Sequence, residues 1–334
     1  MNTMLLAQTQ DLCIFSPASP PAESIRSLSV LVLAITGVIF LLVEGVLFYC
    51  IWRFRPRAST GMEPAQVYGS KPIEVAWTAA PALIVFVLVL VTTRTLWEVV
   101  VEPPEPRPND GALFVTVVGH QWWWEYQYEY HNGEKLGFTT SNELHVPVDG
   151  TNKPRPVYLK LKSADVCHSF WVPRLLGKTD LIPGRTNRTW FRTAEPGLYL
   201  GQCAEYCGTQ HAKMLIRVVA EPIEEFEQWL ANEQKPAADD SAAQKGKSLF
   251  FAQSCINCHA VRFPGSPAKG TFGPDLTHLM SRQTLASGIV PNTPENLRRW
   301  VADPQPIKPG CLMPAFGLSD RERDDIVLYL LTLR

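Results

Sequence analysis

The chain has 334 residues, of which 46% are hydrophobic and 19% charged, and its formal net charge at pH 7 is −1. This length suffices for two modest domains plus additional elements, and a charge so close to zero argues against nucleic acid as a partner. The eight cysteines gather in part in two short motifs, which is not the distribution of a disulfide framework.

Two long apolar segments, residues 28–49 and 75–96, come first along the chain. Each is long enough for a helix to cross about 30 Å of hydrocarbon, so we expect a transmembrane hairpin. The short loop between them is basic and contains Arg53, Arg55 and Arg57, whereas acidic residues follow the second segment. By the positive-inside rule the loop is cytoplasmic, and both termini and everything after the second span face outward.

Two carboxylates belong to these segments: Glu44 lies in the first, and Glu74 lies where the second begins. A carboxylate within a membrane is costly and therefore suggests a function. For Glu74 two interpretations stay open, a functional group and a side chain that only extends to the membrane surface. The sequence assigns no role to Glu44.

From residue 113 onward, short β-prone runs alternate with turns that contain Pro, Gly and Asn. Residues 114–118, 157–161, 189–193 and 215–219 are predicted strands. In the second of these, hydrophobic and polar side chains alternate as in a half-buried strand. Many short strands separated by turns indicate a sandwich or a barrel.

The most informative segment is CAEYCGTQHAKM, which places Cys203, Cys207, His211 and Met214 within twelve residues. Thiolate and thioether are soft ligands and imidazole is borderline, a set that favours copper over magnesium or calcium. On a β frame this segment is a loop between two strands, and His168, in DVCHSF, comes from a separate loop. Zinc stays open at this point, because cysteine and histidine ligands suit it as well.

Three consecutive tryptophans, Trp122, Trp123 and Trp124, stand in the run GHQWWWEYQY. Alternate residues of a strand face opposite sides, so the three cannot share one environment. Ordinary core packing, or an aromatic belt at the membrane surface, accounts for at least one of them. The functional interpretation is a surface through which electrons reach the copper.

The second chemical motif is CINCH, formed by Cys255, Cys258 and His259. It has the C-x-x-C-H pattern of c-type haem attachment, in which two thiols capture the vinyl groups and the adjacent imidazole binds the iron. Methionine is often the second axial ligand, and Met313 in GCLMPAF is the first candidate. Its rivals are His278 and Met280, which lie in THLMSR, a segment that we expect to be helical and partly packed.

Helix signals surround CINCH, as a small haem domain requires. Thr293 precedes a proline at a predicted helix start, and Ser319 with Glu322 forms a capping-box pattern. The predicted divisions are an extracytoplasmic segment (1–27), a transmembrane hairpin (28–100), a β domain (111–230), a polar, alanine-rich linker (231–243) and a haem domain (244–334).

With GHQWWW, DVCHSF, KTDLIPGR and CAEYCGTQHAKM in order after two spans, the chain closely resembles subunit II of haem–copper cytochrome c oxidases. The fused haem domain is similar to that of the caa type, and the resemblance covers nearly the whole chain. It implies a two-helix transmembrane hairpin, then an all-β cupredoxin Greek-key barrel, then a small all-α class I cytochrome c domain.

The resemblance also implies a dinuclear copper centre, Cu-A. Its implied ligands are the bridging thiolates of Cys203 and Cys207, the imidazoles of His168 and His211, the weak ligand Met214 and the backbone carbonyl of Glu205. The Glu205 side chain resembles a magnesium ligand at the boundary with subunit I. Trp122 matches the tryptophan through which electrons enter, and Glu74 matches the glutamate at the mouth of a proton channel into subunit I.

For the haem domain, the resemblance implies one covalent haem c on Cys255 and Cys258, with His259 and Met313 as axial ligands. Gly246, Phe250 and Tyr329 match a packing pattern between the first and last helices. The carbonyl of the segment Gly273-Pro274 would orient the iron-binding histidine.

The function implied is an electron relay in a bacterial inner membrane, with the copper and haem domains and both termini on the periplasmic side. Electrons pass from a cytochrome c or a quinol:cytochrome c reductase to haem c, then to Cu-A, then to haem a in subunit I, where oxygen is reduced to water. Subunits I and III are the expected partners. Two other functions stay open: the electron-accepting subunit of a copper-containing nitric oxide reductase, and a membrane-anchored copper carrier with a tethered cytochrome.

Overall fold

The computed structural model describes residues 13–55, 66, 68–100, 104–148, 150 and 154–334. Part of the predicted N-terminal segment (1–12) and Arg57 of the basic loop lie outside this description. The chain forms two compact units, one made of residues 23–99 and the other of residues 1–22 together with 100–334.

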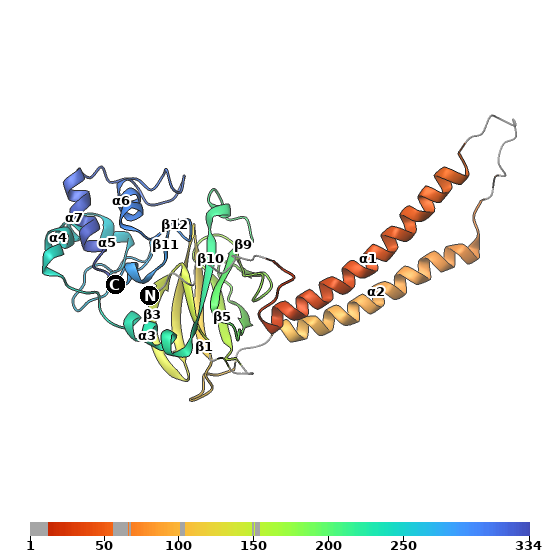
Figure 1. Cartoon of the computed structure of the whole chain (residues 1–334), viewed down its shortest axis with the longest axis horizontal. Coiled ribbons are helices and arrows are strands. Elements are labelled where there is room, and N and C mark those ends of the chain that lie inside the picture. Colours follow the sequence, from red (N-terminus) through yellow and green to blue (C-terminus); the bar gives the residue numbers. More distant parts are fainter. Residues whose placement is uncertain (1–12, 56–65, 67, 101–103, 149, 151–153) are drawn as a thin grey trace. The chain divides into compact units, whose positions relative to one another are not determined.

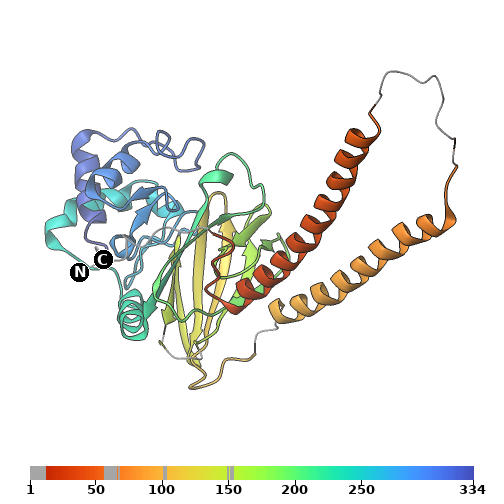
Figure 2. The ribbon, with the colours of Figure 1, turned by 45° about the vertical axis from the view of Figure 1, so that its right-hand side comes forward.

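The first unit contains the two predicted spans, as α1 (Pro20–Arg53) and α2 (Lys71–Val99). Both helices are long and apolar enough to cross a membrane. They run antiparallel and lie closest where α1 begins and α2 ends (Figures 1 and 2), and there Ser24 Oγ donates to Glu98 Oε2 at 2.9 Å. Both extend beyond the predicted apolar spans, because helical hydrogen bonding continues into polar flanks that the hydropathy pattern does not count.

The second unit holds two five-stranded sheets, which form the predicted β domain. Their strand orders are β3-β2-β1-β5-β8 and β4-β10-β9-β6-β7, with β1/β5 and β4/β10 parallel and the other pairs antiparallel. The strands are β1 (Leu113–His120), β2 (Trp123–His131), β3 (Glu134–Ser141), β4 (Glu143–Val148), β5 (Val157–Ser163), β6 (His168–Trp171), β7 (Thr179–Leu181), β8 (Asn187–Phe191), β9 (Gly197–Cys203) and β10 (Leu215–Pro222).

Alternation of side chains builds the core of this domain. In β5, Val157, Leu159 and Leu161 are buried, and the polar residues between them are more exposed. Trp124 of β2 is fully buried and meets Phe170 of β6 edge to face, with 5.5 Å between the ring centroids. All four predicted strands therefore exist, and the two sheets form a curled, cupredoxin-like domain.

A helix that the sequence interpretation missed, α3 (Ile223–Glu233), closes the β domain. Its Phe226 and Leu230 are buried in the β core, and Trp229 stacks on His145 with 4.3 Å between the ring centroids. The predicted linker (231–243) therefore begins inside a helix. The reason is that apolar residues at positions i, i+3 and i+4 define a helix face even in a largely polar segment.

The rest of the second unit is the helical haem domain. Its helices are α4 (Gln244–Ala252), α5 (Cys255–Cys258), α6 (Pro294–Ala302) and α7 (Asp320–Leu330), with a short hairpin of β11 (Thr284–Leu285) and β12 (Val290–Pro291). Both predicted caps are confirmed, since Thr293 accepts from the amide of Asn296 and Ser319 forms a capping box with Glu322.

The first and last helices of the haem domain cross at Gly246. A Cβ atom at this position would lie 1.8 Å from the carbonyl oxygen of Asp325, so only glycine allows so close an approach. One turn further along, Phe250 packs against Tyr329 with 5.5 Å between the ring centroids. The three residues of the expected packing pattern are thus in contact.

Candidate copper and haem centres

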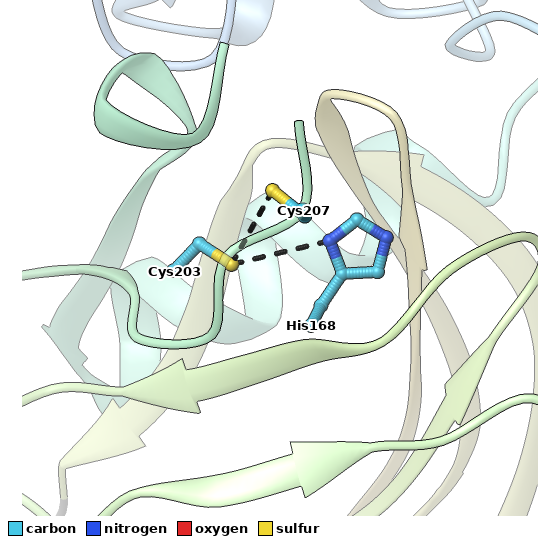
Figure 3. Close-up of side chains that lie close together, drawn as sticks. All are labelled: His168, Cys203 and Cys207. Atoms are coloured by element: carbon cyan, nitrogen blue, oxygen red, sulfur yellow. Dashed lines mark hydrogen bonds between the residues drawn. The ribbon is translucent and has the colours of Figure 1, made fainter. Parts of the chain in front are cut away.

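The soft ligands predicted for copper meet at one end of the β domain. The Sγ atoms of Cys203 and Cys207 are 3.8 Å apart, and His168 Nδ1 lies 3.9 Å from Cys203 Sγ (Figure 3). His211 Nδ1 lies 3.6 Å from Cys207 Sγ on the other side of the pair. His168, Cys203 and Cys207 are all buried, and their ligand atoms lie within 4.8 Å of one another.

The two remaining predicted ligands complete this group. The thioether sulfur of Met214 is 3.9 Å from Cys207 Sγ, and the backbone oxygen of Glu205 is 3.2 Å from Cys203 Sγ. Met214 is fully buried, whereas the side chain of Glu205 is exposed. The structure therefore brings together all six groups in a donor set of sulfur, imidazole and carbonyl, which fits copper.

The ends of three strands hold the copper ligands in place. His168 is the first residue of β6, and Cys203 is the last residue of β9. The loop from β9 to β10 is anchored by a hydrogen bond from Cys203 N to Met214 O at 3.0 Å. At Gly119 of β1, a Cβ atom would lie 2.8 Å from His168 Cδ2, so the glycine leaves room for the imidazole. Ligands fixed by paired strands form a site that is ordered before metal binds.

Asp165 orients His168, a role that the sequence interpretation missed. Its Oδ1 accepts from His168 Nε2 at 2.8 Å and its Oδ2 accepts from the backbone amide of Gln121 at 2.7 Å. Burial opposes ionisation of Asp165, but these bonds outweigh it and lower its pKa. Because the carboxylate holds Nε2, Nδ1 is the nitrogen that faces the thiols. The sequence could have indicated this role, because Asp165 stands three residues before His168, the histidine predicted to bind copper.

The two thiols act as one acidic pair. A hydrogen bond from the Cys207 thiol, against the effect of burial, lowers the pKa of Cys203 to about 3. The Cys203 thiolate in turn raises the pKa of Cys207 well above that of a free thiol. Since the thiol of Cys207 stabilises the thiolate of Cys203, the pair favours a single negative charge, and a soft cation bound there would replace the remaining thiol proton.

Replacing Asp165 with asparagine tests its orienting role. We expect Asp165→Asn to weaken copper binding by at least about tenfold, the scale found when the hydrogen-bond partner of a metal-binding histidine is altered. Titration of copper against a chelator, followed by the visible absorption of the centre, measures this. The matched control Asp180→Asn changes an exposed aspartate of the same sheet. An affinity unchanged in Asp165→Asn would contradict the assignment.

The haem motif opens onto a cavity in the second unit. Cys255, Cys258, His259 and Met313 all line this cavity. Most of the remaining wall is apolar, including Phe250, Leu297 and Val301 of the haem domain. A cavity lined by two thiols, an imidazole and a thioether fits a covalently bound haem.

His259 is held in the orientation that an iron ligand requires. Its Nδ1 donates to the carbonyl oxygen of Pro274 at 2.7 Å, which leaves Nε2 free for a metal. Burial lowers the pKa of His259, so the imidazole is neutral at pH 7. At Gly273 a Cβ atom would lie 2.7 Å from the ring, so this glycine lets the loop approach the histidine.

The rival axial ligands lie elsewhere. His278 is buried with its two ring nitrogens against the carbonyl oxygens of Arg334 and Lys235, at 2.7 and 3.0 Å. Met280 packs against the hydrophobic core of the haem domain. Neither residue lines the cavity that Met313 shares with His259.

Trp122 lies between the two centres. Its indole Nε1 donates to the carbonyl oxygen of Cys207 at 2.9 Å, and the residue also lines the haem cavity. Trp123 lines the same cavity and stacks on His120, with 4.2 Å between ring centroids. Trp124 is fully buried, and both it and Trp122 belong to the hydrophobic core of the β domain.

Two carboxylates that the sequence singles out, Glu74 and Glu205, lie apart from the side chains described above. Glu74 lies in the first turn of α2, and its Oε1 accepts from the amide of Ser70 at 3.2 Å. The exposed Glu205 side chain belongs to no group of histidine, cysteine and acidic side chains poised for a metal in the described part of the chain.

Comparison with known proteins finds matches for all three parts of the chain. Residues 113–221 match the family described as cytochrome c oxidase subunit II, periplasmic domain, residues 7–94 match its transmembrane domain, and residues 243–334 match cytochrome c. The cytochrome c oxidase subunit 2 of Alkalihalophilus pseudofirmus is 32% identical over 97% of this chain and 92% of its own length. That of Bacillus subtilis is 33% identical over the same shares of the two chains.

The two apolar helices, the cupredoxin-like β domain and the cytochrome c domain define a membrane-anchored electron-transfer protein, and its two domain types imply copper and haem c. The chain belongs to the cytochrome c oxidase subunit II family, as the subunit of a haem–copper oxidase with a fused cytochrome c domain. It is therefore a membrane protein with two transmembrane helices and a periplasmic domain. Membership of this family favours the oxidase over a nitric oxide reductase subunit or a copper carrier.

Proposed function

We propose that electrons from a donor reach the covalent haem c of this chain, pass to its Cu-A centre and leave for haem a in subunit I, where oxygen is reduced to water. The observation that supports this route is the position of Trp122. This one residue lines the haem cavity and donates a hydrogen bond to a cysteine of the copper group, at 2.9 Å.

For copper, the proposed roles follow from the donor set. Cys203 and Cys207 would hold copper as thiolates, and a copper pair held in this way would supply one-electron transfer with little change of geometry. Met214 and the Glu205 carbonyl would bind weakly at opposite sides, since each lies beside one of the two sulfurs. His168 and His211 would bind one ion each, because each imidazole nitrogen faces a different sulfur.

For haem, Cys255 and Cys258 would form the thioether links, with His259 and Met313 as the axial ligands. The hydrogen bond to Pro274 fixes the imidazole of His259, and the position of Met313 on the cavity wall supports it as the second ligand. Thioether ligation raises the potential of the iron.

The remaining assignments concern the complex. We assign subunits I and III as partners, a cytochrome c or a quinol:cytochrome c reductase as donor, and a bacterial inner membrane with both termini on the periplasmic side. The exposed carboxylate of Glu205 would help bind magnesium at the boundary with subunit I. Glu74 would mark the cytoplasmic mouth of a proton channel.

The experiment is Trp122→Phe in the intact oxidase. We expect transfer from haem c to Cu-A, followed optically after rapid reduction, to slow by about tenfold or more, because the hydrogen-bonded contact with Cys207 is lost. Both metal spectra should persist. Trp123→Phe is the matched control, since Trp123 lines the same cavity without a hydrogen bond to the copper loop. Unchanged transfer in Trp122→Phe would contradict the proposed route.

A further inference from the structure

A buried lysine of the haem domain reaches the tryptophan between the two centres. Lys308 follows α6 and is only 3% exposed. Its Nζ donates to the carbonyl oxygen of Trp122 at 2.6 Å and to that of Ala286 at 3.1 Å. Lys308 also lines the haem cavity, so the same residue forms part of the cavity wall and binds the backbone of Trp122.

The position is costly for a cation. In the part of the chain that the structure describes, the hydrogen-bond acceptors of Lys308 Nζ are these two carbonyls. Burial lowers the pKa of Lys308 to about 7. Burying an ammonium group costs far more free energy than burying an apolar side chain of similar volume, so the two carbonyls that accept from Nζ are what hold it there. Core packing therefore does not account for a lysine here.

The neighbouring contacts tie the same segment to the copper loop. Next to Lys308, the carbonyl oxygen of Pro309 accepts a hydrogen bond from the side chain of Gln210. Gln210 directly precedes His211, and its side chain is buried. The segment of the haem domain is thus bonded on one side to the backbone of Trp122 and on the other to the loop that carries the copper ligands.

We propose that Lys308 is a positioning residue for electron transfer, which fixes the backbone of Trp122 at the haem cavity while the indole of Trp122 holds the Cys207 carbonyl. The inference rests on the proposed relay from haem c to Cu-A. Lys308 acts through Trp122 and touches no ligand of either metal. Without it, the buried carbonyl of Trp122 and the partly buried carbonyl of Ala286 lose their donor, and the contact that holds Trp122 loosens.

The test is Lys308→Met in the intact oxidase, alone and combined with Trp122→Phe. We expect Lys308→Met to slow transfer from haem c to Cu-A by at least about tenfold, since leaving a buried acceptor unpaired has an effect of this size. The optical spectrum of haem c, the paramagnetic resonance of Cu-A and the reduction of haem c by the external donor should not change. In the double variant, Lys308→Met should add little to the slowing caused by Trp122→Phe.

Two further variants complete the design. Lys269→Met, at an exposed lysine of the haem domain, is the control for loss of charge and should transfer at the wild-type rate. Lys308→Gln, whose shorter side chain cannot reach both carbonyls, replaces Lys308→Met if the latter loses either metal spectrum. The proposal is overturned if the Lys308 variant transfers electrons from haem c to Cu-A at the wild-type rate. It is also overturned if the effects of the Lys308 substitution and of Trp122→Phe on that rate are fully additive. Loss of a metal centre in both Lys308 variants overturns it too, since Lys308 would then be a residue needed only for folding. Failure of the relay itself would be recognised separately, because the wild-type enzyme would then show no transfer from haem c to Cu-A.

Discussion

Cys203→Ser should abolish the mixed-valence copper signal in electron paramagnetic resonance while haem c remains fully reducible. The serine hydroxyl is a hard donor with a far higher pKa than this thiol, so it cannot replace a bridging thiolate. Cys203 contacts its partner thiol, an imidazole and a backbone carbonyl, and the substitution removes the centre of that group. Turnover with the natural donor should fall by more than about 100-fold, the upper end of what altering the surroundings of a ligand costs.

The matched control is Cys167→Ser, directly beside His168 in sequence. The Cys167 thiol is exposed and belongs to neither metal group, so this variant should keep copper and activity. A mixed-valence signal that survives in Cys203→Ser would rule out Cys203 as a bridging ligand. Loss of haem c in the same variant would instead show that the substitution unfolds the periplasmic part of the chain.

Met313→Ala should convert the haem iron from low to high spin and lower its potential by a substantial part of the roughly 0.8 V range that axial ligands span. Alanine cannot reach the iron, so water or no ligand occupies the second axial position. The oxidised state then becomes easier to keep, because a thioether ligand favours the reduced iron. Optical spectra and a redox titration of haem c measure both effects, and the transfer of electrons to Cu-A should fail with them.

Met280→Ala is the control for Met313→Ala. Met280 is partly buried against the core of the haem domain and lies outside the cavity, so Met280→Ala should lower the free energy of unfolding by less than the about 2–5 kcal/mol of a fully buried methionine, without changing the spin state. An unchanged spectrum in Met313→Ala, with a changed one in Met280→Ala, would transfer the axial role to Met280.

The sequence predicted those parts of the fold that depend on local patterns. The strand at residues 157–161 was visible because hydrophobic and polar residues alternate, and the helix cap at Ser319 because its hydroxyl and Glu322 are three residues apart. The gathering of the soft donor side chains was equally visible, since four of the residues predicted to bind copper fall in one loop. Metal chemistry restricts both residue type and spacing, so such a site leaves a strong pattern in the chain.

The parts that escaped prediction depend on contacts between distant segments. Lys308 and Trp122 are 186 positions apart, and no local pattern relates them. Asp165 is close to His168 in sequence, but its bond to Gln121 requires the pairing of separate strands. The predicted start of the linker at residue 231 lies within α3 for a related reason. Only packing against the β core shows that residues 231–233 continue the helix.

The central claim is that this subunit passes electrons from its own haem c to its own Cu-A. Mixing the intact, fully oxidised oxidase rapidly with excess donor, and following both optical signals, tests it most directly. We expect haem c to become reduced first, with Cu-A following at a rate that does not depend on donor concentration. Reduction of Cu-A before haem c, or at a rate proportional to donor concentration, would contradict the relay.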